Sequence, residues 1–273
     1  MALKNYDYIY TIGHSHRTCD DFAYSYSYDG FNISIVCDGC SSAKNSDIGA
    51  RMIASNFIVE FKTRIKIERE SCISSSNIIS SLENIIKKTY IDYRDIYGDE
   101  FLASTIMVAI STNDFTVVYS IGDGVILQKY KNSDIRYINT EFDNNAPGYL
   151  SYILNDEIKR AYLDFSKSYT EYNAYKHDGE YNITENTVSM TDIPVRSFVM
   201  WHEEIKYLML FTDGLTSFTD KNKDISYYVE KMLDVTNDNG VFLQRQVTGV
   251  CRNEERNGNF HQDDLSGIAL IFE

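Results

Sequence analysis

Hydrophobic and polar residues alternate along the first forty positions of the chain. Aromatic and aliphatic side chains recur at every second position in residues 8–12, 22–28 and 31–35. Asp29-Gly30 lies between the last two runs, and an Asp-Gly pair between alternating segments is typical of a tight hairpin turn. The N-terminal part is therefore predicted to form strands, two of which make a β-hairpin.

The hydrophobic period changes after this segment. From Ser46 to Ile65, apolar residues recur every three or four positions, which predicts a long amphipathic helix that Ser46 or Asp47 could cap. Residues 78–93 repeat the helical spacing after a serine-rich turn, so a second helix is expected there.

Strand-like runs return in the second third of the chain, at residues 101–110, 115–121 and 125–130. Residues from about 135 to 200 are polar, rich in tyrosine and without a clean period, and they contain both prolines. We interpret that region as a variable excursion.

The last part of the chain is predicted to hold a buried strand at 207–211, short helices at 227–233 and 241–250, and a closing strand at 265–272. Strands interrupted by helix pairs, without a regular βαβ alternation, favour an antiparallel α+β layered fold. One domain over residues 1–273 is the economical interpretation.

Composition and charge exclude several classes of protein. With 273 residues and 43% hydrophobic content, the chain is neither a miniprotein nor disordered. A formal net charge of −14 gives no general attraction for nucleic acid or anionic lipid. Apolar runs end far short of the roughly 20 residues that span a bilayer. An odd count of five cysteines and the lack of an apolar leader lead us to expect a reducing, cytoplasmic location.

Acidic residues follow the predicted strands in a repeated pattern. Asp38, Asp123 and Asp213 each come directly after an apolar strand and directly before a glycine. The pairs Asp20-Asp21 and Asp263-Asp264 precede two further strands. Carboxylates that converge repel one another unless a cation neutralises them, and oxygen ligands suit Mg²⁺ or Mn²⁺. A single Asp-Gly pair is also a common turn signal, and for Asp29-Gly30 we prefer the turn.

Six segments carry a family resemblance when taken in order: GHSHRTCDDF at 13–22, IVCDGCSSAKNSDIGAR at 35–51, ASTIMVA at 103–109, IGDG at 121–124, LFTDGL at 210–215 and QDDLS at 262–266. Together they resemble the signatures of the PP2C (PPM) family of metal-dependent protein serine/threonine phosphatases. The likeness is to the bacterial-type branch with a DGxGSxxxSxxGA stretch, so a bacterial or phage origin fits. Residues 135–200 contribute little to it.

The resemblance implies an antiparallel β-sandwich flanked by pairs of α-helices, a four-layer α/β/β/α arrangement, with a centre for two Mn²⁺ or Mg²⁺ ions at one end. It assigns the ligands by position: Asp38 as the bridge, Asp213 and Asp263 on one ion, Asp20 and the Gly39 carbonyl on the other, and Asp123 at a weaker third site. Asp21 and Asp264 would lie behind the ligands. Gly39 also has a reason of its own, since a small residue lets its carbonyl approach a metal.

The implied reaction is hydrolysis of phosphoserine or phosphothreonine by direct attack of a metal-bridging hydroxide. A cysteine-based mechanism is not indicated, because no CxxxxxR loop is present. Arg17 could grip the phosphate or be an ordinary exposed arginine. His14 and His16 could protonate the leaving oxygen or be satisfied strand histidines.

The expected partners are a phosphorylated protein substrate and a serine/threonine kinase, with neither nucleic acid nor membrane.

The sequence departs from the family pattern in two places: Gly122-Asp123-Gly124 replaces Gly-Asp-Ser, and the second glycine after Asp38 is missing. These departures motivate an alternative, a weak or inactive phosphoprotein-binding module. A hydrolase of small phosphate esters is a third hypothesis. Cys37 and Cys40 are expected to pack in the core rather than to bind zinc.

Overall fold

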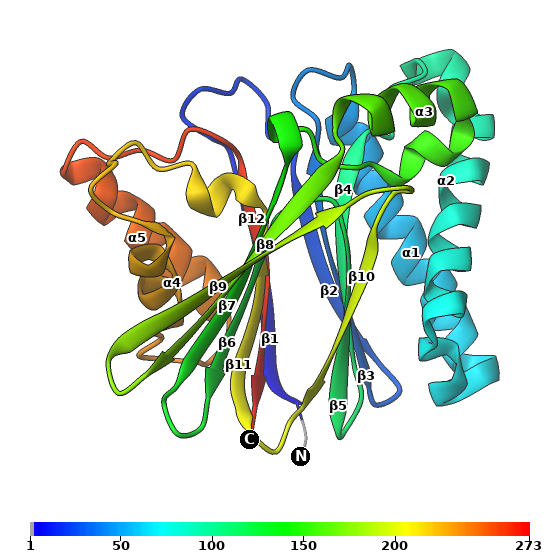
Figure 1. Cartoon of the computed structure of the whole chain (residues 1–273). Helices are drawn as coiled ribbons and strands as arrows, with labels where there is room; N and C mark the ends of the chain where they lie inside the picture. The colour runs from blue at the N-terminus through cyan, green and yellow to red at the C-terminus, as the bar shows by residue number, and fades with distance from the viewer. Residues whose placement is uncertain (1–2) are drawn as a thin grey trace.

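Two antiparallel β-sheets pack face to face in the computed structural model, which describes residues 3–273 (Figure 1). The strands of the larger sheet lie in the order β1 (Leu3–Thr11), β12 (Leu265–Phe272), β11 (Ile205–Phe211), β6 (Gly124–Tyr130), β7 (Ile135–Phe142), β8 (Ser168–His177) and β9 (Glu180–Ser189). Those of the smaller sheet are β10 (Val195–Trp201), β5 (Phe115–Ile121), β4 (Ser104–Ser111), β3 (Phe31–Gly39) and β2 (Phe22–Tyr28).

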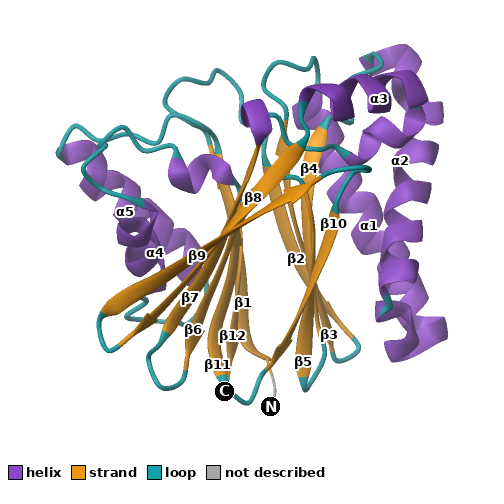
Figure 2. Ribbon diagram, viewed as in Figure 1, coloured by secondary structure: helices purple, strands orange, loops and turns teal. Residues whose placement is uncertain are grey.

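Helices cover the outer face of each sheet. The pair α1 (Ser46–Glu68) and α2 (Ser75–Tyr97) lies on the five-stranded sheet, and α4 (Ile225–Leu233) and α5 (Phe242–Arg256) lie on the seven-stranded sheet (Figure 2). A shorter helix, α3 (Asp156–Phe165), sits above the upper end of the sandwich. The expected four-layer α/β/β/α arrangement is confirmed.

Each interface between layers has its own apolar core. Phe57 and Phe61 of α1 are fully buried against the five-stranded sheet. Leu208 and Ile268 fill the space between the two sheets. On the far side, Phe242 and its neighbours on α5 pack on the seven-stranded sheet. Burial of one face of each helix explains why helical spacing was readable in the sequence.

The predicted hairpin turn is confirmed. Strands β2 and β3 pair in register from Phe22 opposite Cys37 to Tyr28 opposite Phe31. Asp29 and Gly30 both have positive φ, 51° and 83°. This conformation is that of the tight turn that Asp-Gly favours.

The predicted cap of α1 is wrong. The helix begins at Ser46, but neither Ser46 nor Asp47 caps it; the preceding residue, Asn45, has a left-handed backbone and no capping hydrogen bond. The Asn45 side chain instead donates to the carbonyl oxygen of Tyr97 at 2.8 Å. The start of α1 is thus tied to the end of α2, a contact between distant residues that local spacing does not reveal.

Residues 135–200, interpreted above as a variable excursion, contain regular secondary structure. The region contains β7, α3, β8, β9 and β10. Strands β8 and β9 form the outer edge of the larger sheet, where most side chains are exposed or half-buried. An edge hairpin buries neither face fully, so it leaves no hydrophobic period in the sequence.

The acidic strand ends share one end of the sandwich. The loop from β1 to β2, the end of β3, the turn from β5 to β6, the end of β11 and the start of β12 all lie at the upper end in Figure 1. The beginning of β1 and the end of β12 lie at the opposite end.

Within residues 3–273, no helix has the length and apolar character needed to cross a membrane. All five cysteines are free thiols.

Candidate metal centre

Three glycines allow the acidic loops to touch. A Cβ atom at Gly13 would stand 2.4 Å from the carbonyl carbon of Asp263, and one at Gly39 would stand 2.5 Å from the carbonyl oxygen of Asp20. At Gly214 it would stand 1.9 Å from the carbonyl oxygen of Asp264. Such distances exclude any side chain, so the backbones of these loops are in direct contact. The glycine after Asp38 therefore makes room for the Asp20 segment.

Asp264 ties the loop between β1 and β2 to the start of β12. Its carboxylate accepts hydrogen bonds from the backbone N–H of Gly13 at 2.7 Å and of Asp20 at 2.6 Å. The residue is buried. It fixes where Asp20 stands.

His16 lies between the two acids of the C-terminal loop. Its Nε2 is 3.3 Å from Oδ1 of Asp263, and its Nδ1 is 3.1 Å from Oδ1 of Asp264. Burial alone would lower the pKa of His16, but the carboxylates of Asp264, Asp263 and Asp20 outweigh it and raise this pKa. His16, Asp20 and Asp264 each offer one ligand atom within 4.8 Å of the others. The histidine is a loop residue, so its interpretation as a strand histidine is wrong.

Asp38 lies close to three other carboxylates, of which Asp21 and Asp123 are buried, whereas Asp38 itself and Asp213 are half-buried. Burial raises its pKa well above the usual range, and the charges of Asp21, Asp213 and Asp123 raise it further. Burial and the nearby Asp263 raise the pKa of Asp213 to about 6. Burial likewise raises the pKa values of Asp21 and Asp123. Raised pKa values in a cluster of mutually repelling carboxylates are typical of functional sites.

The donor set fits a hard divalent cation. No lysine or arginine of residues 3–273 forms an ion pair with Asp21, Asp38, Asp123 or Asp213. One buried oxygen of Asp123, Oδ1, has no hydrogen-bond partner among the described residues. Oxygen-rich sites of this kind suit Mg²⁺ or Mn²⁺ better than zinc.

Arg196 on β10 is a residue that the sequence analysis missed. It is 8% exposed, and its Nη2 donates to Ser120 of the neighbouring strand β5 at 2.7 Å and to the carbonyl oxygen of Gly122, while its Nη1 reaches across the sandwich and donates to Thr140 of β7. Its Nη1 contacts Glu171 at 3.3 Å. The guanidinium thus holds the peptide that leads into Asp123. An isolated arginine in an unpatterned segment gives no signal of this role.

The remaining candidate side chains differ in their surroundings. Arg17 is exposed and has no ion pair with any residue from 3 to 273. His14, also a loop residue rather than a strand residue, stacks on Phe260 with ring centroids 4.4 Å apart. Arg51 pairs with Asp47 at 3.7 Å and also donates to the Cys19 carbonyl oxygen at 3.3 Å. Cys37 is buried in β3, whereas Cys40 is only partly buried.

Comparison with known proteins agrees with this architecture. The family model described as "Protein phosphatase 2C" matches residues 12–250. The fold is similar to that of the serine/threonine phosphatase Stp1 from Staphylococcus aureus, with a TM-score of 0.64, 15% identity, and coverage of 100% of this chain and 96% of that one. It is also similar to the serine-threonine phosphatase 2C from Toxoplasma gondii, with a TM-score of 0.55, 12% identity, and coverage of 98% and 94%. At these identities the structures establish the fold. A search of curated protein sequences gave no match.

Proposed function

Because the chain belongs to the protein phosphatase 2C family and is a phosphoprotein phosphatase, we propose that it hydrolyses phosphoserine and phosphothreonine in proteins with Mn²⁺ or Mg²⁺ as cofactor. The observation that carries the proposal is the group of buried and half-buried carboxylates around Asp38, whose pKa values are raised by loss of solvent and by mutual repulsion. A divalent cation would remove that repulsion.

We assign the ligands from the placement of the acids. Asp38 has charge interactions with Asp213 and Asp123, so it is the residue best placed to be shared between ions. The other proposed ligands are Asp20, the Gly39 carbonyl, Asp213, Asp263 and Asp123. Two divalent cations held there would supply an acidified water and offset charge on the phosphoryl oxygens.

His16 is the proposed proton donor to the leaving oxygen. Its raised pKa keeps a larger share of the ring protonated near neutral pH, and its carboxylate neighbours Asp263 and Asp264 orient it. Arg17, exposed in the same loop, is the proposed contact for the substrate phosphate. His14 is less suited to proton transfer, since its ring is stacked on Phe260.

The test compares hydrolysis of a phosphothreonine peptide by the natural protein and by Asp38→Asn, each with Mn²⁺ and with EDTA. Turnover is expected only for the natural protein with Mn²⁺, and we expect Asp38→Asn to lose at least about 100-fold in kcat. Asp178→Asn is the matched control, because Asp178 is 90% exposed in the β8–β9 turn. Full activity in Asp38→Asn would overturn the ligand assignment.

A catalytically weak phosphoprotein-binding module is the alternative function. The missing second glycine after Asp38, where this chain has the exposed Ser41, favours it. Calorimetric binding of Mn²⁺ without peptide turnover would support this alternative over the phosphatase. Both functions imply a serine/threonine kinase that makes the phosphorylated partner, and both suit a cytoplasmic protein.

A further inference from the structure

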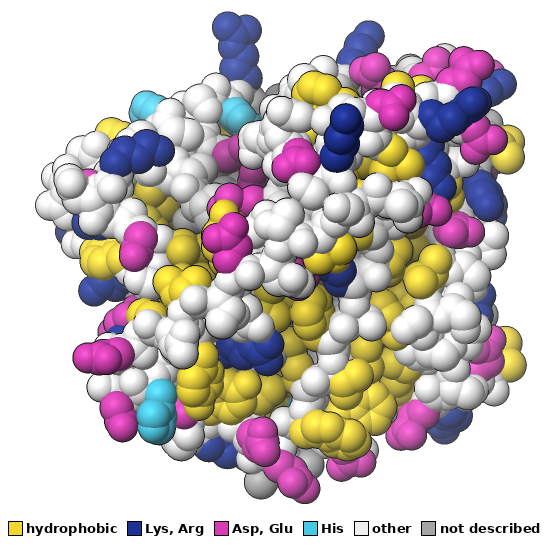
Figure 3. Space-filling model, in the orientation of Figure 1, with side chains coloured by type: hydrophobic (Ala, Val, Ile, Leu, Met, Phe, Trp, Pro, Cys, Tyr) yellow, Lys and Arg dark blue, Asp and Glu magenta, His cyan; other side chains and the backbone are white. Residues whose placement is uncertain are grey.

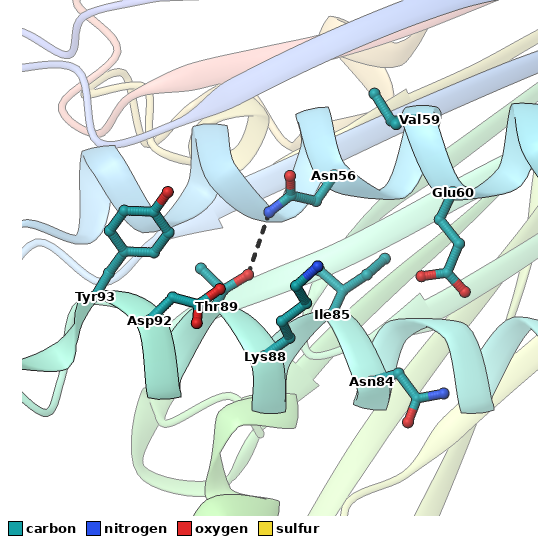
Figure 4. A pocket seen from close by; sticks show the side chains of 9 residues that line it. All are labelled: Asn56, Val59, Glu60, Asn84, Ile85, Lys88, Thr89, Asp92 and Tyr93. Atoms are coloured by element: carbon teal, nitrogen blue, oxygen red, sulfur yellow. Dashed lines mark hydrogen bonds between the residues drawn. The ribbon is translucent and has the colours of Figure 1, made fainter.

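Two cavities adjoin the helical layer on the five-stranded sheet. The first is a groove of about 330 Å³ between α1 and α2, which the hydrogen bond from Asn56 to Thr89 crosses (Figure 4). Its rim mixes Glu60, Lys88 and Asp92, so neither charge nor shape points to one kind of ligand.

The second cavity, which we name the tyrosine pocket, has a more definite chemistry. Its volume is about 410 Å³, and it opens between the β3–α1 loop, the end of α2 and the segment leading into α3. The lining residues that decide its character are Cys40, Tyr90, Asp99, Glu100, Tyr149 and Tyr152.

The tyrosine pocket begins beside the acidic centre. Cys40 lies two residues after Asp38 and lines the pocket. Burial, the Cys40 thiol and the charge of Asp38 all raise the pKa of Tyr149, so this phenol stands close to both. A substrate group bound in the pocket would therefore lie close to the substrate's phosphorylated residue when that residue is bound at the acidic centre near Asp38.

The walls of the tyrosine pocket suit a cation. Asp99 and Glu100 are exposed at its rim, and none of the lining residues described is lysine or arginine. Asp99 accepts a hydrogen bond from the Tyr90 hydroxyl at 2.6 Å, which fixes its carboxylate. The rings of Tyr149 and Tyr152 lie 5.3 Å apart. Aromatic faces and carboxylates together favour guanidinium or ammonium groups.

We propose that the tyrosine pocket binds a lysine or arginine side chain of the substrate, two or three residues from the phosphorylated residue. In an extended peptide, two or three residues span roughly 7–10 Å, which suits a pocket that begins beside Asp38. The site therefore selects phosphoproteins with a basic residue near the phosphate. This inference rests on the proposed function.

The test uses phosphothreonine peptides with arginine, alanine or glutamate placed in turn at each of the three positions on either side. For at least one position, KM is expected to be about tenfold lower with arginine than with alanine, with kcat unchanged. The double variant Asp99→Asn, Glu100→Gln should lose this preference while keeping its turnover of the alanine peptide. The asparagine retains an acceptor for the Tyr90 hydroxyl.

The control is the double variant Asp178→Asn, Glu180→Gln, which removes the same charge from the exposed β8–β9 turn. It should keep the arginine preference, because general attraction to an acidic protein is not the cause. Equal KM values for arginine and alanine peptides in the natural protein would overturn the proposal that the tyrosine pocket binds a basic side chain, even if the protein hydrolyses both peptides. An equal loss of preference in the control would overturn it too.

A binding measurement separates this inference from the proposed function. Fluorescence anisotropy of the same labelled peptides, measured on Asp38→Asn, needs no turnover. We expect the arginine peptide to bind more tightly than the others, and we expect this difference to disappear with the Asp99 and Glu100 substitutions. That result would support binding of arginine in the tyrosine pocket even if no hydrolysis is detected. Identical anisotropy curves for all the peptides would overturn it.

Discussion

At the scale of single residues, the carboxylates around Asp38 repel one another, and a bound cation would reduce this repulsion. Asp213 is the clearest case, since burial and Asp263 raise its pKa to about 6, whereas an aspartate in an unfolded chain titrates near about 3.9. Between these values the folded protein keeps a proton that the unfolded chain has released. Its stability is therefore greatest below this window and falls as the pH rises through it.

We accordingly expect the metal-free protein to lose on the order of 2 kcal/mol of unfolding free energy from this group as the pH rises from about 4 to about 7. Denaturant titrations in EDTA measure the loss, and Mn²⁺ should restore the stability at the higher pH. Asp213→Asn should flatten the profile. An unchanged slope in this variant would show that Asp213 is not the group responsible.

Individual site residues differ in how far the sequence could predict them. Asp38, Asp123 and Asp213 were recognisable because each follows an apolar strand and precedes a glycine. The pairing of His16 with Asp263 and Asp264 joins residues about 250 positions apart, so no local pattern encodes it. Arg196 acts through the Gly122 carbonyl, a contact that only the assembled sandwich creates.

At the scale of elements, close backbone contacts bring the strand ends together. Gly214→Ala would place a methyl group 1.9 Å from the Asp264 carbonyl oxygen, so the loops after β11 and before β12 must separate. We expect a loss of about 1–3 kcal/mol of stability and weaker Mn²⁺ binding, measured by denaturant titration and calorimetry.

Gly249→Ala provides the matched control. Gly249 lies inside α5, and a Cβ there meets nothing within 4 Å. Alanine favours the helix, so this variant should gain up to about 1 kcal/mol and bind Mn²⁺ normally. Equal stability losses in both variants would argue against the steric explanation for Gly214.

Elements were predictable where the sequence shows a hydrophobic pattern, which the largely buried strand β7 lacks. Helices α1 and α2 and strands β2 to β6 were all located from their hydrophobic period. Strands β8 and β9 were not, because their side chains are largely exposed at the sheet edge. The cap of α5 is another non-local case: Asp7 of β1 accepts a hydrogen bond from the backbone N–H of Gln244 at 3.1 Å, across 237 positions.

At the scale of the whole molecule, acidic side chains outnumber basic ones by 40 to 26. In the view of Figure 3, acidic groups are spread over the face, from its upper end to its lower edge, and an apolar patch lies in the lower middle. Val199 and Trp201 of β10 are each 59% exposed. Excess negative charge of this size destabilises a compact state through self-repulsion.

Monovalent salt should therefore stabilise the metal-free protein. Raising NaCl from about 20 to about 300 mM shortens the range of electrostatic repulsion. We expect about 1 kcal/mol of added stability, equivalent to a rise of roughly 2–4 °C in Tm. Calorimetry in EDTA checks this, with sucrose of equal osmolality as the control. A fall in Tm would show that attractive ion pairs outweigh the net repulsion.

The pairing of β1 with β12 joins the first and last described strands of the chain, from Leu3 opposite Phe272 to Thr11 opposite Leu265. Contacts between such distant positions form slowly, because a long loop must close before they are made. The loop after β1 meets Asp263 and Asp264 only once this pairing exists. A chain during synthesis therefore lacks a complete acidic centre until its last strand docks. Catalytic competence would then arise at the final step of folding, after the rest of the sandwich has formed.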